Sequence, residues 1–171
     1  MRILFVTPYP PSRIRVRGYG FLKQLQRVHE VTIIAQCASE QELADVVKLR
    51  DQGFEVVVVQ ESKLRSARQS ALALFDAVPL QVAYARSIRF ARAIEQLCTQ
   101  RSFDVIHVEH LRGIASLAHL AKTHPLVWDA VDCISLLCKH TIAAGPSRSV
   151  RMVARFEHQR TRRYEAQMLS L

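Results

Sequence analysis

The first twenty residues decide the fold of this chain: Met1-Arg-Ile-Leu-Phe-Val-Thr-Pro-Tyr-Pro-Pro-Ser12 runs directly into Arg13-Ile-Arg-Val-Arg-Gly-Tyr-Gly20. Residues 2–7 are a short apolar run rich in β-formers, which is typical of a strand buried on both faces of a sheet. Prolines stop this strand, and a loop with arginines and glycines precedes an amphipathic helix. Ligands of open parallel sheets bind where a first strand ends in such a loop. The chain therefore begins with its candidate active edge.

The loop after this strand has the chemistry to bind negative charge. Its three arginines alternate, so an extended segment would project all of them to one side. Two glycines follow where we expect a helix to begin, and helix N-termini favour anions. The candidate binding residues of the loop are Arg13, Arg15, Arg17, Gly18, Tyr19 and Gly20. The alternative is a loop stabilised by its own prolines, with its arginines in water.

Strand and helix patterns alternate along the rest of the chain. Strand patterns cover residues 31–36, 55–60, 103–108 and 126–131, and helical patterns lie between them, including 62–75 and 111–122. Ser39 and Ser87 are placed to cap helices, and Gly53 to end one. The alternation predicts an α/β fold: a Rossmann-like, doubly wound parallel sheet of about five or more strands, with helices on both faces.

The C-terminal part differs in character. Asp132 is expected to cap a helix that closes near Gly145, and residues 146–171 predict one long basic helix. This helix ends abruptly, which suggests a fragment boundary. We therefore divide the chain into a Rossmann-like domain, 1–145, and the basic C-terminal helix, 146–171. The thin apolar stripe of that helix comprises Met152, Phe156, Tyr164, Met168 and Leu171.

Composition sets the outer bounds on function. The chain has 171 residues, 49% of them hydrophobic, which is enough for one full core. The net charge of +9 comes mostly from arginine, and it suits nucleic acid, nucleotides or an anionic membrane surface. A solvated basic surface is the alternative. No CxxC pair, secretory signal or membrane-spanning run is present, so we expect free cysteines and a cytoplasmic protein.

Polar residues also end the fourth and fifth predicted strands. Glu109, His110 and Arg112 follow the fourth strand, and a histidine there can accept a proton near pH 7. His107 alternates with core valines, so we interpret it as a buried, hydrogen-bonded histidine. No cysteine or acidic partner sits at zinc-ligand spacing from the two histidines, and no metal is expected. Asp129 is a candidate for binding the hydroxyl groups of a ligand, or else it forms a salt bridge with a nearby arginine.

Four segments together resemble family 4 glycosyltransferases of the GT-B fold: the quoted N-terminal stretch, His29-Glu-Val-Thr-Ile33, Phe103-Asp-Val-Ile-His-Val-Glu-His-Leu-Arg112 and Trp128-Asp-Ala-Val-Asp-Cys-Ile-Ser135. The resemblance covers essentially all 171 residues. Such enzymes have two Rossmann-like halves, of which the N-terminal half holds mainly the acceptor and the C-terminal half the nucleotide-sugar. This chain departs from the family in carrying arginines where a paired glycine is commoner.

The resemblance implies the acceptor-binding half of an enzyme that transfers a sugar from a nucleotide-sugar to a hydroxyl acceptor, such as a polysaccharide, glycolipid or lipid-linked intermediate. His110 would contact the sugar or the acceptor hydroxyl, and the arginine loop would face the donor diphosphate. The helix 146–171 would lead toward a missing donor-binding domain, so the chain alone would be inactive. We expect no cofactor besides the nucleotide-sugar as co-substrate. Its basic surface would allow peripheral contact with the inner face of the membrane.

Two other interpretations compete. A non-enzymatic basic α/β module could bind nucleic acid or an anionic membrane, although Phe156 and Tyr164 look needed for packing rather than for stacking on bases. Another Rossmann-like nucleotide enzyme lacks support, because the GxGxxG and P-loop patterns are both missing. Glu157 and Glu165 match the spacing of a glutamate pair in the family's other domain. We interpret them instead as partners for neighbouring arginines.

Overall fold

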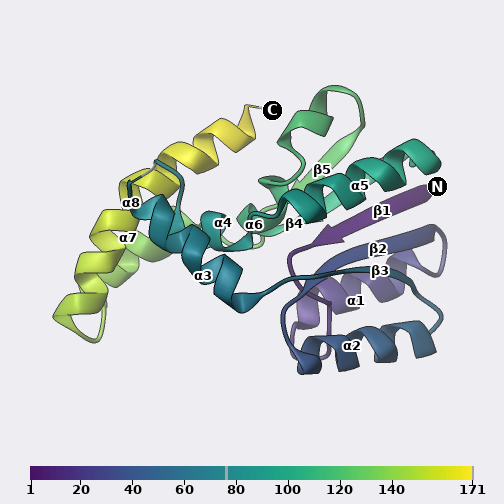
Figure 1. The fold of residues 1–171 in the computed structure, drawn as a ribbon, viewed down its shortest axis with the longest axis horizontal. Helices are drawn as coiled ribbons and strands as arrows, with labels where there is room; N and C mark the ends of the chain where they lie inside the picture. Colours follow the sequence, from purple (N-terminus) through teal and green to yellow (C-terminus); the bar gives the residue numbers. More distant parts are fainter. Residues whose placement is uncertain (76, 171) are drawn as a thin grey trace.

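A five-stranded, all-parallel sheet forms the centre of the molecule (Figure 1). The computed structural model describes residues 1–75 and 77–170, and of residues 63, 65 and 75 only the backbone. The strand order is β3-β2-β1-β4-β5, which confirms the predicted α/β, Rossmann-like fold. The strands are β1 (Arg2–Thr7), β2 (Glu30–Cys37), β3 (Glu55–Gln60), β4 (Val105–Glu109) and β5 (Leu126–Asp129).

Helices cover both faces of this sheet (Figure 1). One face packs against α1 (Val16–Leu25) and α2 (Glu40–Asp51), and the other against α5 (Ile88–Gln100) and the short α4 and α6. The remaining elements are α3 (Lys63–Leu72), η1 (Ala73–Phe75), α4 (Leu80–Ala85), α6 (His110–Ile114), η2 (Ala118–Lys122), α7 (Ile134–Ala144) and α8 (Arg148–Leu169).

The first strand is buried on both sides, as its composition predicts. Ile3 and Phe5 belong to the core beneath α1 and α2, whereas Leu4 and Val6 belong to the core beneath α5. Alternate side chains of a strand point to opposite faces, so a continuous apolar run fits a central parallel strand. The order β2-β1-β4 also makes the gap between β1 and β4 the switch point of the sheet, where ligands of such folds bind.

Three helix ends lie where the sequence predicts them. The Ser39 side chain accepts from the Glu42 amide at 3.3 Å, and the Ser87 side chain accepts from the Phe90 amide at 3.0 Å. Gly53 follows α2 with a φ of +85°, a conformation that glycine adopts without strain. All four cysteines are free, as expected.

The structure corrects the predictions from sequence at three places in the second half. The helix expected over 111–122 is broken into α6 and η2, and α4 begins directly after Pro79 where no helix was predicted. The predicted cap Asp132 is wrong, because α7 begins after Cys133. The Glu165 carboxylate of α8 accepts from the Ser135 amide at 3.2 Å and so takes over the capping role.

Helices α7 and α8 pack on each other as a hairpin that extends away from the sheet (Figure 1). Glu157 pairs with Arg160 at 3.2 Å, as expected, but Glu165 caps α7 instead of meeting an arginine. The predicted stripe is only partly buried. Tyr164 and Met168 pack on the core, Met152 and Phe156 are exposed, and Leu171 lies outside the described residues.

Candidate functional site

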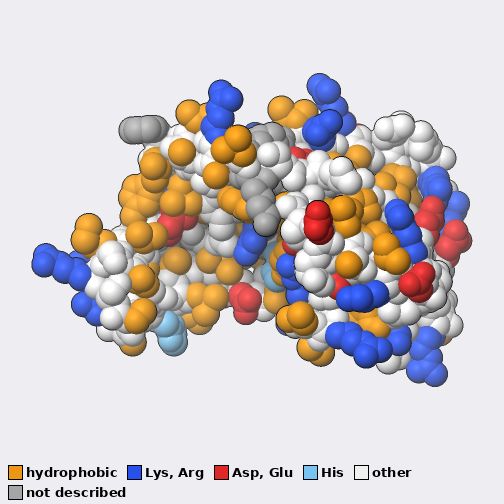
Figure 2. Space-filling model, turned by 60° about the horizontal axis from the view of Figure 1, so that its bottom comes forward, with side chains coloured by type: hydrophobic (Ala, Val, Ile, Leu, Met, Phe, Trp, Pro, Cys, Tyr) orange, Lys and Arg blue, Asp and Glu red, His pale blue; other side chains and the backbone are white. Residues whose placement is uncertain are grey.

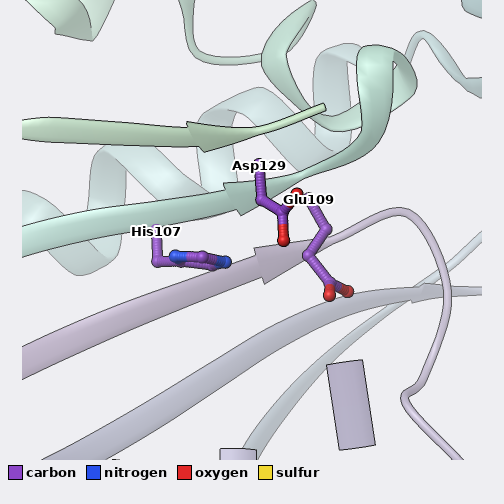
Figure 3. A group of neighbouring side chains, drawn as sticks. All are labelled: His107, Glu109 and Asp129. Carbon is purple, nitrogen blue, oxygen red and sulfur yellow. The ribbon is translucent and has the colours of Figure 1, made fainter. Parts of the chain in front are cut away.

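The switch point of the sheet gathers polar side chains. Glu109 and Asp129 end β4 and β5 and are direct partners in the register of the two strands. His107 precedes Glu109 by two residues, so its side chain points to the same face. One nitrogen of His107 and one carboxylate oxygen from each acid all lie within 4.8 Å of one another. Figure 3 shows the two carboxylates and the far edge of the imidazole ring drawn together at the strand ends.

Glu109 is the chemically distinctive member of this group. Its side chain is buried, with 4% of the residue exposed. Burial raises the pKa of Glu109 to about 7, and the charge of Asp129 adds to the rise, whereas the Thr7 hydroxyl and Arg17 oppose it. A carboxyl group with a pKa near 7 exchanges a proton readily at neutral pH, which is what general acid–base chemistry requires.

Gly18 explains how Glu109 fits beneath α1. A Cβ atom at this position would lie 2.6 Å from Glu109 Oε1 and 2.7 Å from Oε2. The helix can therefore approach the carboxyl group only because residue 18 has no side chain. Gly20, two residues further along the same helix, has open space where its Cβ would be. The two glycines of the quoted loop thus differ in role.

The loop arginines do not project to one side, and that expectation is wrong. Helix α1 begins at Val16, so Arg17 to Gly20 are helical and not part of a loop. Arg15 lies over the Tyr9 ring, 3.8 Å from its centroid, and pairs with Glu42 at 3.3 Å. Arg17 forms a salt bridge with Asp129, in which one guanidinium nitrogen donates to Oδ1 at 2.8 Å and to Oδ2 at 3.0 Å. Of the three arginines only Arg17 is helical, and Arg15 and Arg17 pair with different acids.

Two other predicted residues, Arg13 and Tyr19, lie apart from Glu109, and Asp129 is held in contacts within the protein. Arg13 is exposed and lines a separate hollow beside α2. The Tyr19 hydroxyl donates to Gln52 at 2.5 Å, away from the strand ends. For Asp129, the salt-bridge alternative is the one observed, and its carboxylate also accepts from the Val131 amide at 3.0 Å.

His110 adopts a backbone conformation that side chains rarely take, with a φ of 63°. It is the first residue of α6, and its Nε2 hydrogen-bonds the Tyr9 hydroxyl. Burial and the charge of Arg112 lower the pKa of His110, so it is neutral at pH 7. His110, Glu109, Gly18 and Tyr9 line a hollow of about 170 Å³ at the N-terminus of α1. Strained residues held by their surroundings are frequent at functional sites.

His107 is buried, as predicted, but it is not hydrogen-bonded. Its ring stacks on Phe5 with centroids 4.7 Å apart, and burial lowers its pKa. Its Nε2 atom has no hydrogen-bond partner among the described residues. The imidazole is therefore a neutral, partly unsatisfied neighbour of the two carboxyl groups.

The group His107, Glu109 and Asp129 has side chains of the types that bind metal ions. Sequence spacing did not indicate this, because Asp129 joins His107 and Glu109 only through the pairing of β5 with β4. The guanidinium of Arg17 already occupies both oxygens of Asp129. A metal ion at Asp129 would have to displace this guanidinium.

Tyr9 is the residue that sequence reasoning missed. It separates the hollow at Glu109 from a larger cavity of about 380 Å³, and it lines both, as does Arg15. Arg112 lines the larger cavity and is half-buried. The sequence offered one signal for Tyr9, its position: it is an aromatic residue between two prolines, two residues after the first strand.

In comparisons with known proteins, no family model matches the chain and no curated protein matches it. The fold and the site together define a Rossmann-like α/β protein with a polar, partly buried edge at the switch point of its sheet. Among the described residues, no helix combines the length and the apolar character needed to cross a membrane.

Proposed function

We propose that residues 1–171 are the acceptor-binding part of a glycosyltransferase that moves a sugar from a nucleotide-sugar to a hydroxyl group. The observation that carries this proposal is Glu109, a buried carboxyl group with a pKa of about 7 at the switch point of the sheet. The hollow beside it is open to a ligand and is bordered by the neutral imidazole of His110. The resemblance to GT-B enzymes supports the same reaction.

In the proposed reaction, the acceptor hydroxyl attacks the anomeric carbon of the donor sugar. The new bond joins the acceptor oxygen to that carbon, and the bond from the carbon to the diphosphate oxygen breaks. The hydroxyl proton passes to the ionised Glu109 carboxylate, and the nucleoside diphosphate leaves with the bonding electron pair. His110 would hold the acceptor or the sugar by a hydrogen bond. No metal ion or further cofactor enters this scheme.

The test is a transfer assay with nucleotide-sugars and simple glycoside acceptors. The whole protein that contains residues 1–171 is expected to transfer sugar. Residues 1–171 alone are expected to bind an acceptor without transferring, because positioning of both substrates contributes most of the rate. Robust turnover by residues 1–171 would contradict the division into acceptor and donor parts. Absence of transfer by the whole protein across a broad donor and acceptor panel would contradict the function.

We place the proposed membrane contact on the α7–α8 hairpin. Figure 2 shows apolar side chains gathered over the hairpin at the left of the view, with basic groups at its tip. The exposed apolar side chains include Leu136, Leu137, Met152, Val153 and Phe156. Exposed arginines alternate with them along α8, a combination typical of helices that lie on anionic membranes.

Vesicle binding tests this contact. The chain is expected to sediment with vesicles rich in anionic phospholipid at low salt and to be released by high salt. Replacing Arg148, Arg151 and Arg155 together by glutamine is expected to weaken binding at least tenfold. The matched control replaces Arg27, Arg68 and Arg92, which are exposed elsewhere. Equal losses in the two triple variants would contradict a specific role of the hairpin.

A further inference from the structure

We propose that the larger cavity beside Tyr9 binds the phosphate group of a phosphorylated sugar or polyol, with Arg112 as the residue that recognises the phosphate. The cavity has a volume of about 380 Å³, within the range of small-molecule sites. It lies at the carboxyl ends of β1 and β2, next to the hollow that contains Glu109. Besides Arg112 and Tyr9, it is lined by Arg15, Gln36, Ser39, Glu42 and Tyr84. This inference rests on the proposed function, since it describes the acceptor that Glu109 would deprotonate.

Arg112 is the cation of this cavity that is left without a counter-charge. Among the described residues, no side chain or carbonyl group forms a hydrogen bond or ion pair with its guanidinium. Arg15, by contrast, is held by Glu42, by the Pro10 carbonyl group and by the face of Tyr9. A half-buried guanidinium with five free donors is well suited to grip phosphate oxygens in pairs.

The acids of the cavity are hydrogen-bonded to groups other than Arg112. The Glu42 carboxylate pairs with Arg15 and also accepts from the Ala38 amide at 2.8 Å. Glu61 accepts from the Ser87 hydroxyl. Both carboxylates are therefore engaged on the α2 and α5 side of the cavity. Among the described residues, neither carboxylate contacts the Arg112 guanidinium, so its donors remain for a ligand.

The position of Arg112 is fixed by its backbone. The next residue, Gly113, lies so close to β4 that a Cβ atom there would be 2.8 Å from Val108 Cγ2. Helix α6 is thus held tightly on the sheet, and Arg112 can meet a ligand with little loss of backbone freedom. The charge of Arg112 also acts on Tyr9 and His110, both of which border the Glu109 hollow. A phosphate at Arg112 would therefore lie next to the proposed reaction centre.

The rest of the cavity offers groups for hydroxyls. The Ser39 and Tyr84 side chains line it, and the Tyr84 hydroxyl has no partner among the described residues. Aromatic rings of this kind can pack against the apolar face of a sugar or polyol, and polar side chains can hydrogen-bond its hydroxyl groups. The ligand class is accordingly a phosphate attached to a polyhydroxylated body, either a free sugar phosphate or the headgroup of a lipid-linked acceptor.

Titration calorimetry on residues 1–171 tests the site without any transfer reaction. The probes are glucose 1-phosphate, its methyl diester as the soluble equivalent of a lipid-linked headgroup, and uncharged methyl glucoside. We expect glucose 1-phosphate or the diester to bind at least tenfold more tightly than methyl glucoside at low salt. Preference for the monoester would indicate a free sugar phosphate, and preference for the diester a lipid-linked acceptor.

Substitutions at position 112 decide the role of the arginine. Arg112→Gln is expected to reduce phosphate-dependent binding at least tenfold and Arg112→Lys to reduce it less. Arg92→Gln, at an exposed position of α5, is expected to leave binding unchanged. Thermal unfolding checks that each variant folds. Equal affinity of the wild type and Arg112→Gln, or no preference for the phosphorylated probes, would overturn the site. Failure of transfer by the whole protein with Arg112-dependent binding intact would instead overturn only the proposed function.

Discussion

Replacing Glu109 by glutamine is expected to lower the rate of sugar transfer by about 10²- to 10⁴-fold, the usual contribution of a positioned general base. Glutamine keeps the shape of the side chain and its contact with Thr7 but cannot accept the acceptor proton. The loss is therefore expected in kcat, with little change in the KM for the donor. Transfer kinetics of the whole protein measure this. Glu30→Gln, at an exposed position at the start of β2, is the matched control.

The same substitution is expected to stabilise the fold at neutral pH. A carboxyl group whose pKa rises from 4.5 in the unfolded chain to about 7 in the folded one binds more protons when folded. Stability is then fully present below pH 4.5 and is lost as the pH rises toward 7, by up to about 3 kcal/mol. Glu109→Gln removes that loss. Denaturant unfolding at pH 5 and pH 8 measures it, and a variant less stable than the wild type at pH 8 would contradict the argument.

Gly18→Ala is the second change with a large expected effect. Its Cβ would lie 2.6 Å from Glu109 Oε1, so the buried carboxyl group or helix α1 has to move. Overpacking of this kind costs roughly 1–3 kcal/mol, and a displacement near the reacting group reduces rates by about 10- to 100-fold. Urea unfolding and transfer kinetics measure the two effects.

Gly20→Ala provides the control within the same helix. Nothing lies within 4 Å of its Cβ position, and alanine is a better helix former than glycine by about 1 kcal/mol. We expect Gly20→Ala to leave transfer unchanged and to stabilise the chain slightly. If both alanine variants behaved alike, Gly18 would have no special part in placing Glu109.

The fold could be predicted because its signals are local. The apolar run of β1, the serine caps of α2 and α5 and the glycine after α2 each act within a few residues of the feature that they specify. The parallel sheet with helices on both faces follows from the alternation of strands and helices. The end of β4 could therefore be named as a candidate site from the sequence, including Glu109 and His110.

The geometry of the site could not be predicted, because it depends on contacts between distant residues. Arg17 meets Asp129 across 112 positions of the chain, and Glu109 owes its environment to Gly18. An alternating run of arginines suggests an extended loop, but the hydrophobic face of α1, with Leu22 fully buried, starts the helix at Val16 instead. That Arg112 has no ion-pair partner among the described residues could not be predicted either, because it depends on where acids distant in the sequence lie in the fold.

The most direct test of the account is the titration of the Glu109 carboxyl group in residues 1–171. Carbon-13 NMR of glutamate-labelled protein, with Glu109→Gln to assign the signal, gives its pKa without any substrate. We predict a value of about 7, raised by burial and by the charge of Asp129. A value near 4.5, the ordinary range of glutamate, would contradict the assignment of Glu109 as the group that accepts the acceptor proton.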